Sequence, residues 1–410
     1  MITCYLDSQD YSTLTDPHSG TPDRREIKAA LLHFARSKQV RFAFSATAVC
    51  EAVALTPDSA HFAELKAELL SDLCGSNALV SFDRLIGAEV QALSLRSSRR
   101  GDMFDPHGRW FPEIPIDENP HDLWRRMRVL AEEEMAAMGM SRQERRAKTR
   151  NLIKNGKPRH WLKGHLNQQD PKVYAEELLK RYPMRADFAE IMGLYALGRA
   201  TEKEFTDALM NSLSDPRWMM KWFTTHNALS SPIAEIVRQP GRELGQLMRT
   251  LARLANEWAT TLKNGGLDDP TGKQGEIAFR WQEMEQRQLV DLVQKIANSK
   301  RIDLGNYAVA DVEAYCPGIS AAIKSLYSSV WANVGGGRKE EASDSQPVDA
   351  LHAFYAPYVQ IFRADRFMAP HIQKQVINAG TIVVPRLSQL VNTLEKHLSY
   401  CSGPEKSQAA

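Results

Sequence analysis

The sequence predicts an α/β fold in which one parallel sheet is assembled from both chain ends and is interrupted by a large all-α insertion. Three observations support this fold class. Short apolar runs alternate with amphipathic helical patterns over residues 1–95, which is typical of a parallel sheet covered by helices. Helical patterns dominate the middle of the chain. Strand patterns return after residue 345, and neither end alone has enough strands to bury a sheet.

The first part of the predicted sheet domain, residues 1–95, combines expected strands with expected helices. The strands are runs of buried-type residues, and the helices show apolar residues at helical spacing. Ser45 stands where it can cap the second of these helices. The expected strands are 2–6, 40–44 and 78–82, and the expected helices are 27–37, 45–55 and 62–73.

Residues 96–334 form the predicted helical insertion. It opens with a stretch rich in Arg, Pro, Gly and Asp (96–120), which we interpret as a loop. Strand signals are scarce after this loop, so we expect an all-α region of at least seven helices. The helical patterns cover residues 121–138, 173–182, 187–197, 202–213, 242–263, 275–298 and 309–330.

The C-terminal part of the chain returns to the α/β pattern. Three successive glycines and a polar, charged stretch predict a flexible linker over residues 335–346. Residues 347–400 are expected to complete the sheet domain, and residues 401–410 to form a frayed tail. In this second part the expected helices are 348–355 and 387–398, and the expected strands are 358–362 and 381–384.

Composition sets the broad class of the protein. The 410 residues are 43% hydrophobic and 25% charged, which is enough apolar material for a sizeable core. The five cysteines are scattered and never have C-x-x-C spacing, so we expect reduced thiols and no zinc cluster. No stretch is apolar enough for a membrane span, and the first residues lack the basic region of a secretory signal. A cytoplasmic protein is the expectation.

Four carboxylates occupy informative places. Asp7 follows the first strand, and Glu51 lies on the helix after the second strand. Asp349 opens a helix, and Asp365 follows the fourth strand. Acids beyond the ends of parallel strands meet at the carboxyl edge of the sheet, where such folds bind ligands. Clustered carboxylates repel one another, and an oxygen-seeking divalent cation relieves that repulsion. We therefore predict a site for Mg²⁺ or Mn²⁺ formed by these four acids.

Each acid also has a simpler interpretation. Asp7 is placed like a turn residue, and Asp349 like an acid that interacts with a helix dipole. Glu89 is a further candidate acid, although a solvated helix position is the expectation for it. His352 shares a helical face with Asp349, and we interpret it as a packing or supporting residue rather than a metal ligand.

Five short segments at the two chain ends carry a family resemblance: ITCYLDS (2–8), SATAVCE (45–51), DALHA (349–353), YVQIFRAD (358–365) and TIVVPRL (381–387). They resemble the PIN-domain superfamily of metal-dependent nucleases. The resemblance implies a three-layer α/β domain, one or two Mg²⁺ or Mn²⁺ ions held by Asp7, Glu51, Asp349 and Asp365, and cleavage of RNA or structured DNA. Two positions depart from the family pattern: Gln9 replaces a frequent Asn, and Arg363 a frequent Thr or Ser.

A basic stretch within the insertion is the second functional signal. Residues 141–165 contain nine Lys and Arg against one acid, Glu144. Such a stretch can neutralise several phosphates, and an aromatic residue within it can stack on an exposed base. The alternative is a solvated helix face that offsets nearby acids. The residues predicted to bind nucleic acid are Arg142, Arg145, Arg146, Lys148, Arg150, Lys154, Lys157, Arg159, Trp161 and Lys163.

Together these features predict a Mg²⁺/Mn²⁺-dependent nuclease that hydrolyses phosphodiester bonds, with RNA favoured over DNA. The helical insertion is expected to bind substrate or a protein partner. Because PIN-domain proteins often act as growth-arresting toxins or in defence, the resemblance also implies a toxin or antiviral defence effector. The alternative is a non-catalytic nucleic-acid-binding or scaffold protein with a degenerate PIN-like domain, and Gln9 and Arg363 keep this alternative open.

Overall fold

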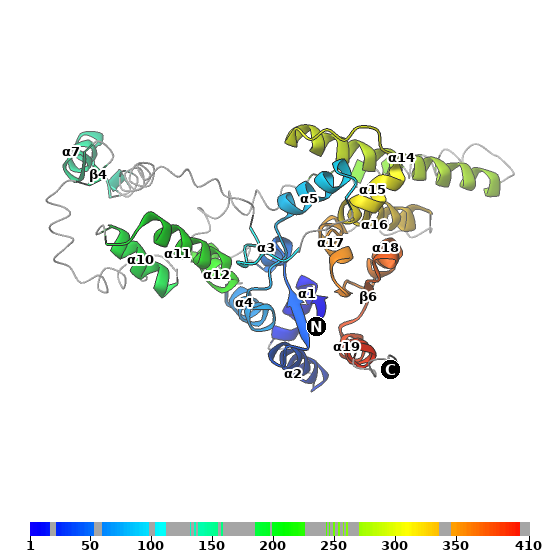
Figure 1. The fold of residues 1–410 in the computed structure, drawn as a ribbon, viewed down its shortest axis with the longest axis horizontal. Helices are drawn as coiled ribbons and strands as arrows, with labels where there is room; N and C mark the ends of the chain where they lie inside the picture. The colour runs from blue at the N-terminus through cyan, green and yellow to red at the C-terminus, as the bar shows by residue number, and fades with distance from the viewer. Residues whose placement is uncertain are drawn as a thin grey trace, which may run out of the picture. The chain divides into compact units, whose positions relative to one another are not determined.

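A four-stranded parallel sheet organises the computed structural model of the chain (Figure 1). Strands from opposite chain ends are neighbours in it, because β1 pairs with β5 and places Cys4 opposite Ile361. The predicted α/β class with a parallel sheet is confirmed. The strand order is β2-β1-β5-β6, with β1 at Ile2–Tyr5, β2 at Val40–Ala43, β5 at Ile361–Arg363 and β6 at Ile382–Val384.

The described residues divide into two compact units, Met1–Pro112 with Ser214–Ala410, and Glu113–Leu213. Two parts of the expected insertion, residues 96–112 and 214–334, therefore group with the sheet, and one inserted domain over 96–334 stays a prediction. The structure describes residues 1–16, 22–52, 60–97, 103–111, 132, 135–136, 138–154, 157–158, 185–196, 199–225, 243, 246, 249–250, 253–254, 257, 260, 270–335 and 346–401.

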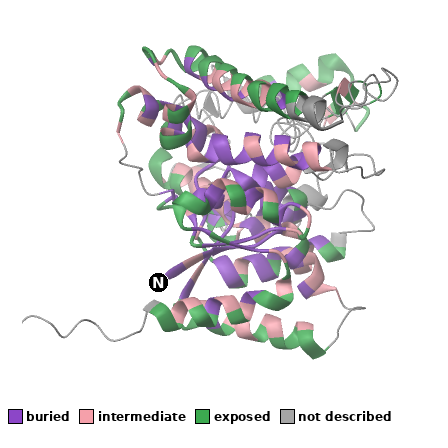
Figure 2. Ribbon diagram, turned by 90° about the vertical axis from the view of Figure 1, so that its right-hand side faces the viewer, coloured by how far each residue is buried: buried purple, intermediate pink, exposed green. Residues whose placement is uncertain are grey.

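The strands form because their residues suit burial on both faces of a sheet. Tyr5, Phe42 and Phe362 are fully buried, and helices lie on both sides of the buried strands (Figure 2). This burial explains why the strands appear in the sequence as continuous apolar runs. The strands expected at 2–6, 40–44 and 381–384 correspond to β1, β2 and β6.

Two expected strands differ from the structure. Residues 78–82 form only isolated bridges, a parallel one from Ala78 to Phe44 and an antiparallel one from Leu79 to Phe104. The strand expected at 358–362 begins later, at Ile361, because Ala356–Tyr358 (η3) is a short 3-10 helix. Proline at the start of η3 lacks a backbone N–H and favours a helical first turn over a sheet ladder.

The helices of the first part follow the predicted alternation with the strands. Helix α1 was not expected, and it begins because Asp7 caps its N-terminus and accepts a hydrogen bond from the Gln9 N–H. The helices are α1 Ser8–Thr15, α2 Pro22–Arg36, α3 Ala46–Ala52, α4 Ala60–Cys74 and α5 Phe82–Ser94.

Several later helices of the same unit pack around α16, which contacts α5, α14, α15, α17 and α18, whereas α12 contacts α4 and α19 contacts α2. The single helix expected over 309–330 is wrong: it is broken into α15 and α16 because Pro317 has no N–H to continue the hydrogen-bond ladder. The helices are α12 Pro216–Thr225, α14 Pro270–Lys300, α15 Val309–Tyr315, α16 Pro317–Gly335, α17 Gln346–Ala353, α18 Ala369–Val376 and α19 Leu387–Cys401, with η4 Ile377–Ala379 after α18.

The smaller unit contains the basic stretch. Its helix α7 (Arg142–Leu152) leads into a short antiparallel ribbon of β3 (Ile153–Lys154) and β4 (Lys157–Pro158). The helices expected at 187–197 and 202–213 correspond to α10 (Ala186–Ala196) and α11 (Glu202–Ser214). The helices expected at 121–138, 173–182 and 242–263, the core of the linker and the tail after residue 401 lie wholly or largely outside the described residues.

Glu89 joins three segments that are far apart in the sequence. Its buried carboxylate accepts hydrogen bonds from Gly318 N (2.5 Å) and Ile319 N (2.9 Å) at the start of α16, and from the Tyr358 hydroxyl. A Cβ atom at Gly318 would lie 2.6 Å from the Phe354 carbonyl oxygen, so only glycine permits this approach. The expected solvated position of Glu89 is wrong, because the free N–H groups of a helix N-terminus need an acceptor.

Replacing Glu89 with Ala should lower the free energy of unfolding by about 2–4 kcal/mol, because two backbone N–H groups and a hydroxyl lose their buried acceptor. Urea unfolding followed by circular dichroism measures this change. Glu68→Ala on the exposed face of α4 is the matched control and should stay within about 0.5 kcal/mol of the wild type. Equal losses for both variants would contradict the role of Glu89.

Candidate active site

Two of the predicted acids follow neighbouring strand ends. β1 ends at Tyr5 and β5 at Arg363, and Asp7 and Asp365 each stand two residues further on. Because β1 and β5 are adjacent and parallel, both acids leave the sheet at the same edge. Asp7 is buried and Asp365 is half-buried. Each carboxylate is also fixed locally, since Oδ1 of Asp7 accepts from Gln9 N and Oδ1 of Asp365 accepts from Met368 N.

Asp349, on α17, is the acid with an unpartnered oxygen. Its Oδ2 atom is buried and has no hydrogen-bond partner. Burial, followed by the negative charges of Asp365, Asp7 and Glu51, raises the pKa of Asp349 to about 8 against the opposing positive charge of His352. Electrostatic repulsion of this kind falls with distance, so the four predicted acids lie in one neighbourhood at the carboxyl edge of the sheet.

Glu51 is paired with His352. The Glu51 side chain is 30% exposed on α3, and its Oε2 lies 2.7 Å from Nε2 of His352 on α17. Burial opposes protonation of His352, but the charge and hydrogen bond of Glu51 outweigh it and raise the pKa of His352 to about 9. Burial likewise opposes ionisation of Glu51, yet the charge of His352 and hydrogen bonds from His352 and Ser8 lower its pKa.

A hydrogen-bonded row of side chains orients this pair from within the sheet. The Tyr5 hydroxyl lies 2.6 Å from Nδ1 of His352 and 2.6 Å from Oγ of Ser45. The Tyr5 ring stacks on Phe362 at a centroid distance of 5.2 Å. Sequence reasoning missed Tyr5 and Ser45 as site residues because a tyrosine inside an apolar strand looks like ordinary core.

Arg363 forms a buried ion pair behind the acids. Its Nη2 atom lies 3.1 Å from Oδ1 of Asp10 on α1, and both side chains are less than 10% exposed. Burial raises the pKa of Asp10 to about 7 against the opposing charge of Arg363. The sequence signal for Asp10 was its place three residues after Asp7, where its carboxylate accepts from the Asp7 N–H as part of a capping box.

The donor set matches an oxygen-seeking cation, since all four acids are carboxylates and one buried oxygen has no partner. As the side chains stand, no three His, Cys, Asp or Glu residues in the described part of the chain are arranged to hold a metal ion. A divalent cation would therefore have to draw the carboxylates closer together, against the restraints from Met368 and His352.

The predicted nucleic-acid-binding residues lie in the smaller unit, Glu113–Leu213. Arg142, Arg146 and Arg150 are exposed and spaced by four residues, so they form a stripe on one face of α7. Lys148 is exposed as well, whereas Arg145 is half-buried and donates to the Glu132 carbonyl. Lys154 and Lys157 belong to β3 and β4, and Arg159, Trp161 and Lys163 lie outside the described residues.

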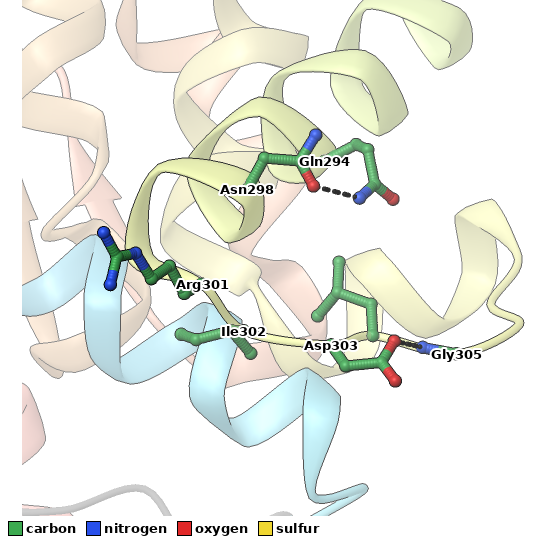
Figure 3. A pocket seen from close by; sticks show the side chains of 7 residues that line it. Gln294, Asn298, Arg301, Ile302, Asp303 and Gly305 are labelled. Atoms are coloured by element: carbon green, nitrogen blue, oxygen red, sulfur yellow. Dashed lines mark hydrogen bonds between the residues drawn. The ribbon is translucent and has the colours of Figure 1, made fainter.

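A hollow at the C-terminal end of α14 is a separate feature (Figure 3). Its volume is about 420 Å³, and Gln294, Asn298 and Asp303 among its lining side chains are hydrogen-bonded. Gln294 Nε2 donates to Asn298 Oδ1 at 2.9 Å, and Gly305 N donates to Asp303 Oδ1 at 3.0 Å. Asp303 is the single carboxylate among the side chains drawn, so this hollow lacks the acid cluster of the sheet edge.

No protein-family model, curated protein or solved structure matches this chain. None of the helices in the described residues is long and apolar enough to cross a membrane. The side chains of Cys4, Cys50, Cys74 and Cys316 are buried.

The site should make the stability of the cation-free protein fall as pH rises. Asp349 and His352 both have pKa values raised above those of the unfolded chain, so the folded state holds extra protons. Their stabilising effect is complete at low pH and is lost as pH rises through about 8 and about 9. Each group contributes a slope of at most about 1.4 kcal/mol per pH unit.

Urea unfolding in EDTA between pH 6 and pH 9 measures this dependence. Asp349→Asn should be more stable than the wild type at pH 8 and should show a shallower decline, because the amide carries no charge. Asp291→Asn on α14, whose side chain is 54% exposed, is the control and should follow the wild-type curve. An unchanged slope in Asp349→Asn would show that Asp349 is not held protonated.

Proposed function

We propose that this chain is a divalent-cation-dependent nuclease that hydrolyses phosphodiester bonds, with RNA as its substrate. The observation that carries the proposal is the buried Oδ2 atom of Asp349, which has no hydrogen-bond partner although the charges of Asp7, Glu51 and Asp365 act on this side chain. A cluster of this kind is costly to bury unless a cation joins it, so a fold that keeps it requires a reason. The sequence segments that resemble the PIN-domain superfamily contain the same four acids.

Asp7, Glu51, Asp349 and Asp365 would hold Mg²⁺ or Mn²⁺ in this proposal. When bound, the cation supplies a water of lowered pKa and neutralises charge on the scissile phosphate. The chain itself limits where the acids can point. Backbone N–H groups fix Asp7 and Asp365, and His352 fixes Glu51.

Cations of the protein also reduce the charge that an approaching phosphate meets. His352 is positively charged at neutral pH because its pKa is raised, and Arg363 neutralises Asp10 behind the acids. Lys66 on α4 adds a further positive charge that interacts with Glu51. Without these cations, the acidic edge would repel a polyanionic substrate more strongly.

The exposed stripe of Arg142, Arg146 and Arg150 is the proposed surface for the nucleic-acid backbone. Three guanidinium groups on one helix face can each contact a phosphate, and the released counterions make such binding depend on salt. The proposal thus includes RNA binding through this stripe. It also includes a protein partner or inhibitor that binds the helical region, and a toxin or defence role for the protein.

The alternative function is a non-catalytic nucleic-acid-binding or scaffold protein. One observation favours it: Glu51 and Asp10 already have internal cationic partners in His352 and Arg363. These pairs leave fewer unpaired carboxylates for a metal. Both functions predict binding of nucleic acid, but only the nuclease predicts its cleavage. Binding and cleavage must therefore be measured on the same variants.

The test uses the full chain with labelled single-stranded RNA and Mn²⁺, and EDTA as the blank. Asp365→Asn preserves shape, and asparagine can still accept from Met368 N. Cleavage should fall by roughly 10²-fold or more while RNA affinity stays or rises, because one negative charge is removed from the site. Induced expression of the wild type, but not of this variant, should arrest growth.

The matched variant in the same test replaces Arg142, Arg146 and Arg150 with Gln. RNA affinity should fall, and the salt dependence of binding should become flatter by about 0.7 per lost contact to a single strand. Cleavage should recover at saturating RNA, because the acids are untouched. Full cleavage by Asp365→Asn with an unchanged melting temperature would refute the nuclease proposal. Binding without any cleavage by the wild type would favour the non-catalytic alternative.

A further inference from the structure

A pocket is lined in part by the two residues that follow the proposed catalytic acid Asp365 in the sequence. It has a volume of about 580 Å³ and is lined by Ala332, Arg366, Phe367, Pro370 and His371, which we call the Phe367 pocket. Arg366 and Phe367 are the two residues after Asp365. The volume lies within the range of about 300–1,000 Å³ that is typical of pockets for small ligands.

Hydrogen bonds fix the conformation of the turn between Asp365 and α18. The position of Asp365 relative to the lining residues Arg366 and Phe367 is therefore fixed as well. Asp365 Oδ1 accepts from Met368 N, and the Asp365 carbonyl accepts from Ala369 N at 3.0 Å. Arg366 and Phe367 lie inside this hydrogen-bonded turn. The Cα atoms of Asp365 and Phe367 can be no more than about 7 Å apart, because they are separated by two residues.

Two aromatic rings form one wall of the pocket. The Phe367 and His371 rings have centroids 5.3 Å apart and are tilted by 56°. The Nδ1 atom of His371 lies 2.8 Å from Oγ of Ser328 on α16, which fixes the His371 ring. Pro370 and Ala332 complete a largely apolar lining, and the exposed Arg366 adds a positive charge at its rim.

The chemistry of the lining indicates the occupant. A flat aromatic group can stack on the Phe367 ring and contact the tilted His371 ring, and a phosphate can pair with the Arg366 guanidinium. A nucleotide joins both groups in one molecule. An aromatic wall inside a pocket can accept an unpaired base only, because bases in a duplex are stacked on one another.

We infer that the Phe367 pocket binds the unpaired base of the nucleotide adjacent to the scissile bond of single-stranded RNA, with Arg366 on a neighbouring phosphate. This inference rests on the proposed function, since the scissile bond is assigned by the acids. The pocket would position the strand over Asp365 and would make the enzyme selective for single strands over duplexes.

The test measures binding of a single-stranded RNA decamer that contains 2-aminopurine, whose fluorescence changes on stacking. The full chain carries Asp7→Asn to prevent cleavage, and asparagine still caps α1. In this background Phe367→Leu keeps an apolar side chain but removes the ring. Affinity should fall about tenfold or more, as expected for the loss of one stacked base.

Controls separate the pocket from general effects. Phe279→Leu on α14, where the ring is 61% exposed, should leave affinity and fluorescence unchanged. Arg366→Gln should flatten the salt dependence by about 0.7, whereas Arg287→Gln, whose side chain is 85% exposed, should not. A duplex of the same sequence should compete weakly and show no dependence on Phe367.

The outcomes distinguish this inference from the proposed function. If the unsubstituted chain cleaves RNA but Phe367→Leu and Phe279→Leu bind equally, the pocket inference is overturned and the nuclease stands. If the unsubstituted chain cleaves nothing with Mn²⁺ while base stacking still requires Phe367, the pocket stands and the nuclease proposal falls. Equal dependence of duplex binding on Phe367 would also overturn the inference, because a paired base cannot enter the pocket.

Discussion

The parallel pairing of β1 with β5 is the constraint on which the site depends. Hydrogen bonding that places Tyr5 opposite Phe362 joins the two ends of a 410-residue chain in one sheet. It brings Asp7 and Asp365 to adjacent strand ends and stacks the Tyr5 ring on Phe362. The same Tyr5 side chain then contacts His352, so the pairing also sets the position of Glu51. A change that separates these strands would disperse every group proposed to act in catalysis.

Burying several acids close together costs electrostatic free energy. The surrounding structure offsets this cost for some of the acids and not for others. Glu51 is paired with His352, and Asp10 is paired with Arg363, whereas the Oδ2 atom of Asp349 has no partner. This unevenness is informative, because buried polar atoms of a folded protein normally have a hydrogen-bond partner. A divalent cation is the simplest group that relieves the repulsion around Asp349 and at the same time serves phosphodiester hydrolysis.

Much of the sheet could be predicted from the sequence, because buried parallel strands appear as apolar runs with acids just beyond them. β1, β2 and β6 were predicted from their apolar runs, and of these three β1 has an acid just beyond it, whereas the register of β1 on β5 required the structure. Glu89 could not be assigned from the sequence, since its partners at Gly318 and Ile319 are more than 220 residues away. The β3–β4 ribbon had a local signal that was overlooked, the Asn-Gly pair between its strands. Arg363 had no partner that the sequence could indicate, and only the fold connects it to Asp10.

Binding of Mn²⁺ to the full chain, followed at pH 8 by the loss of the electron paramagnetic resonance signal of free Mn²⁺, tests the central claim most directly. The four-acid site predicts saturable binding to the wild type that Asp349→Asn weakens at least tenfold, because one of its anionic oxygens is removed. Glu68→Gln, on the exposed face of α4, should bind as the wild type does. Absence of saturable binding to the wild type, or equal binding to Asp349→Asn, would contradict the claim that these acids form a cation site.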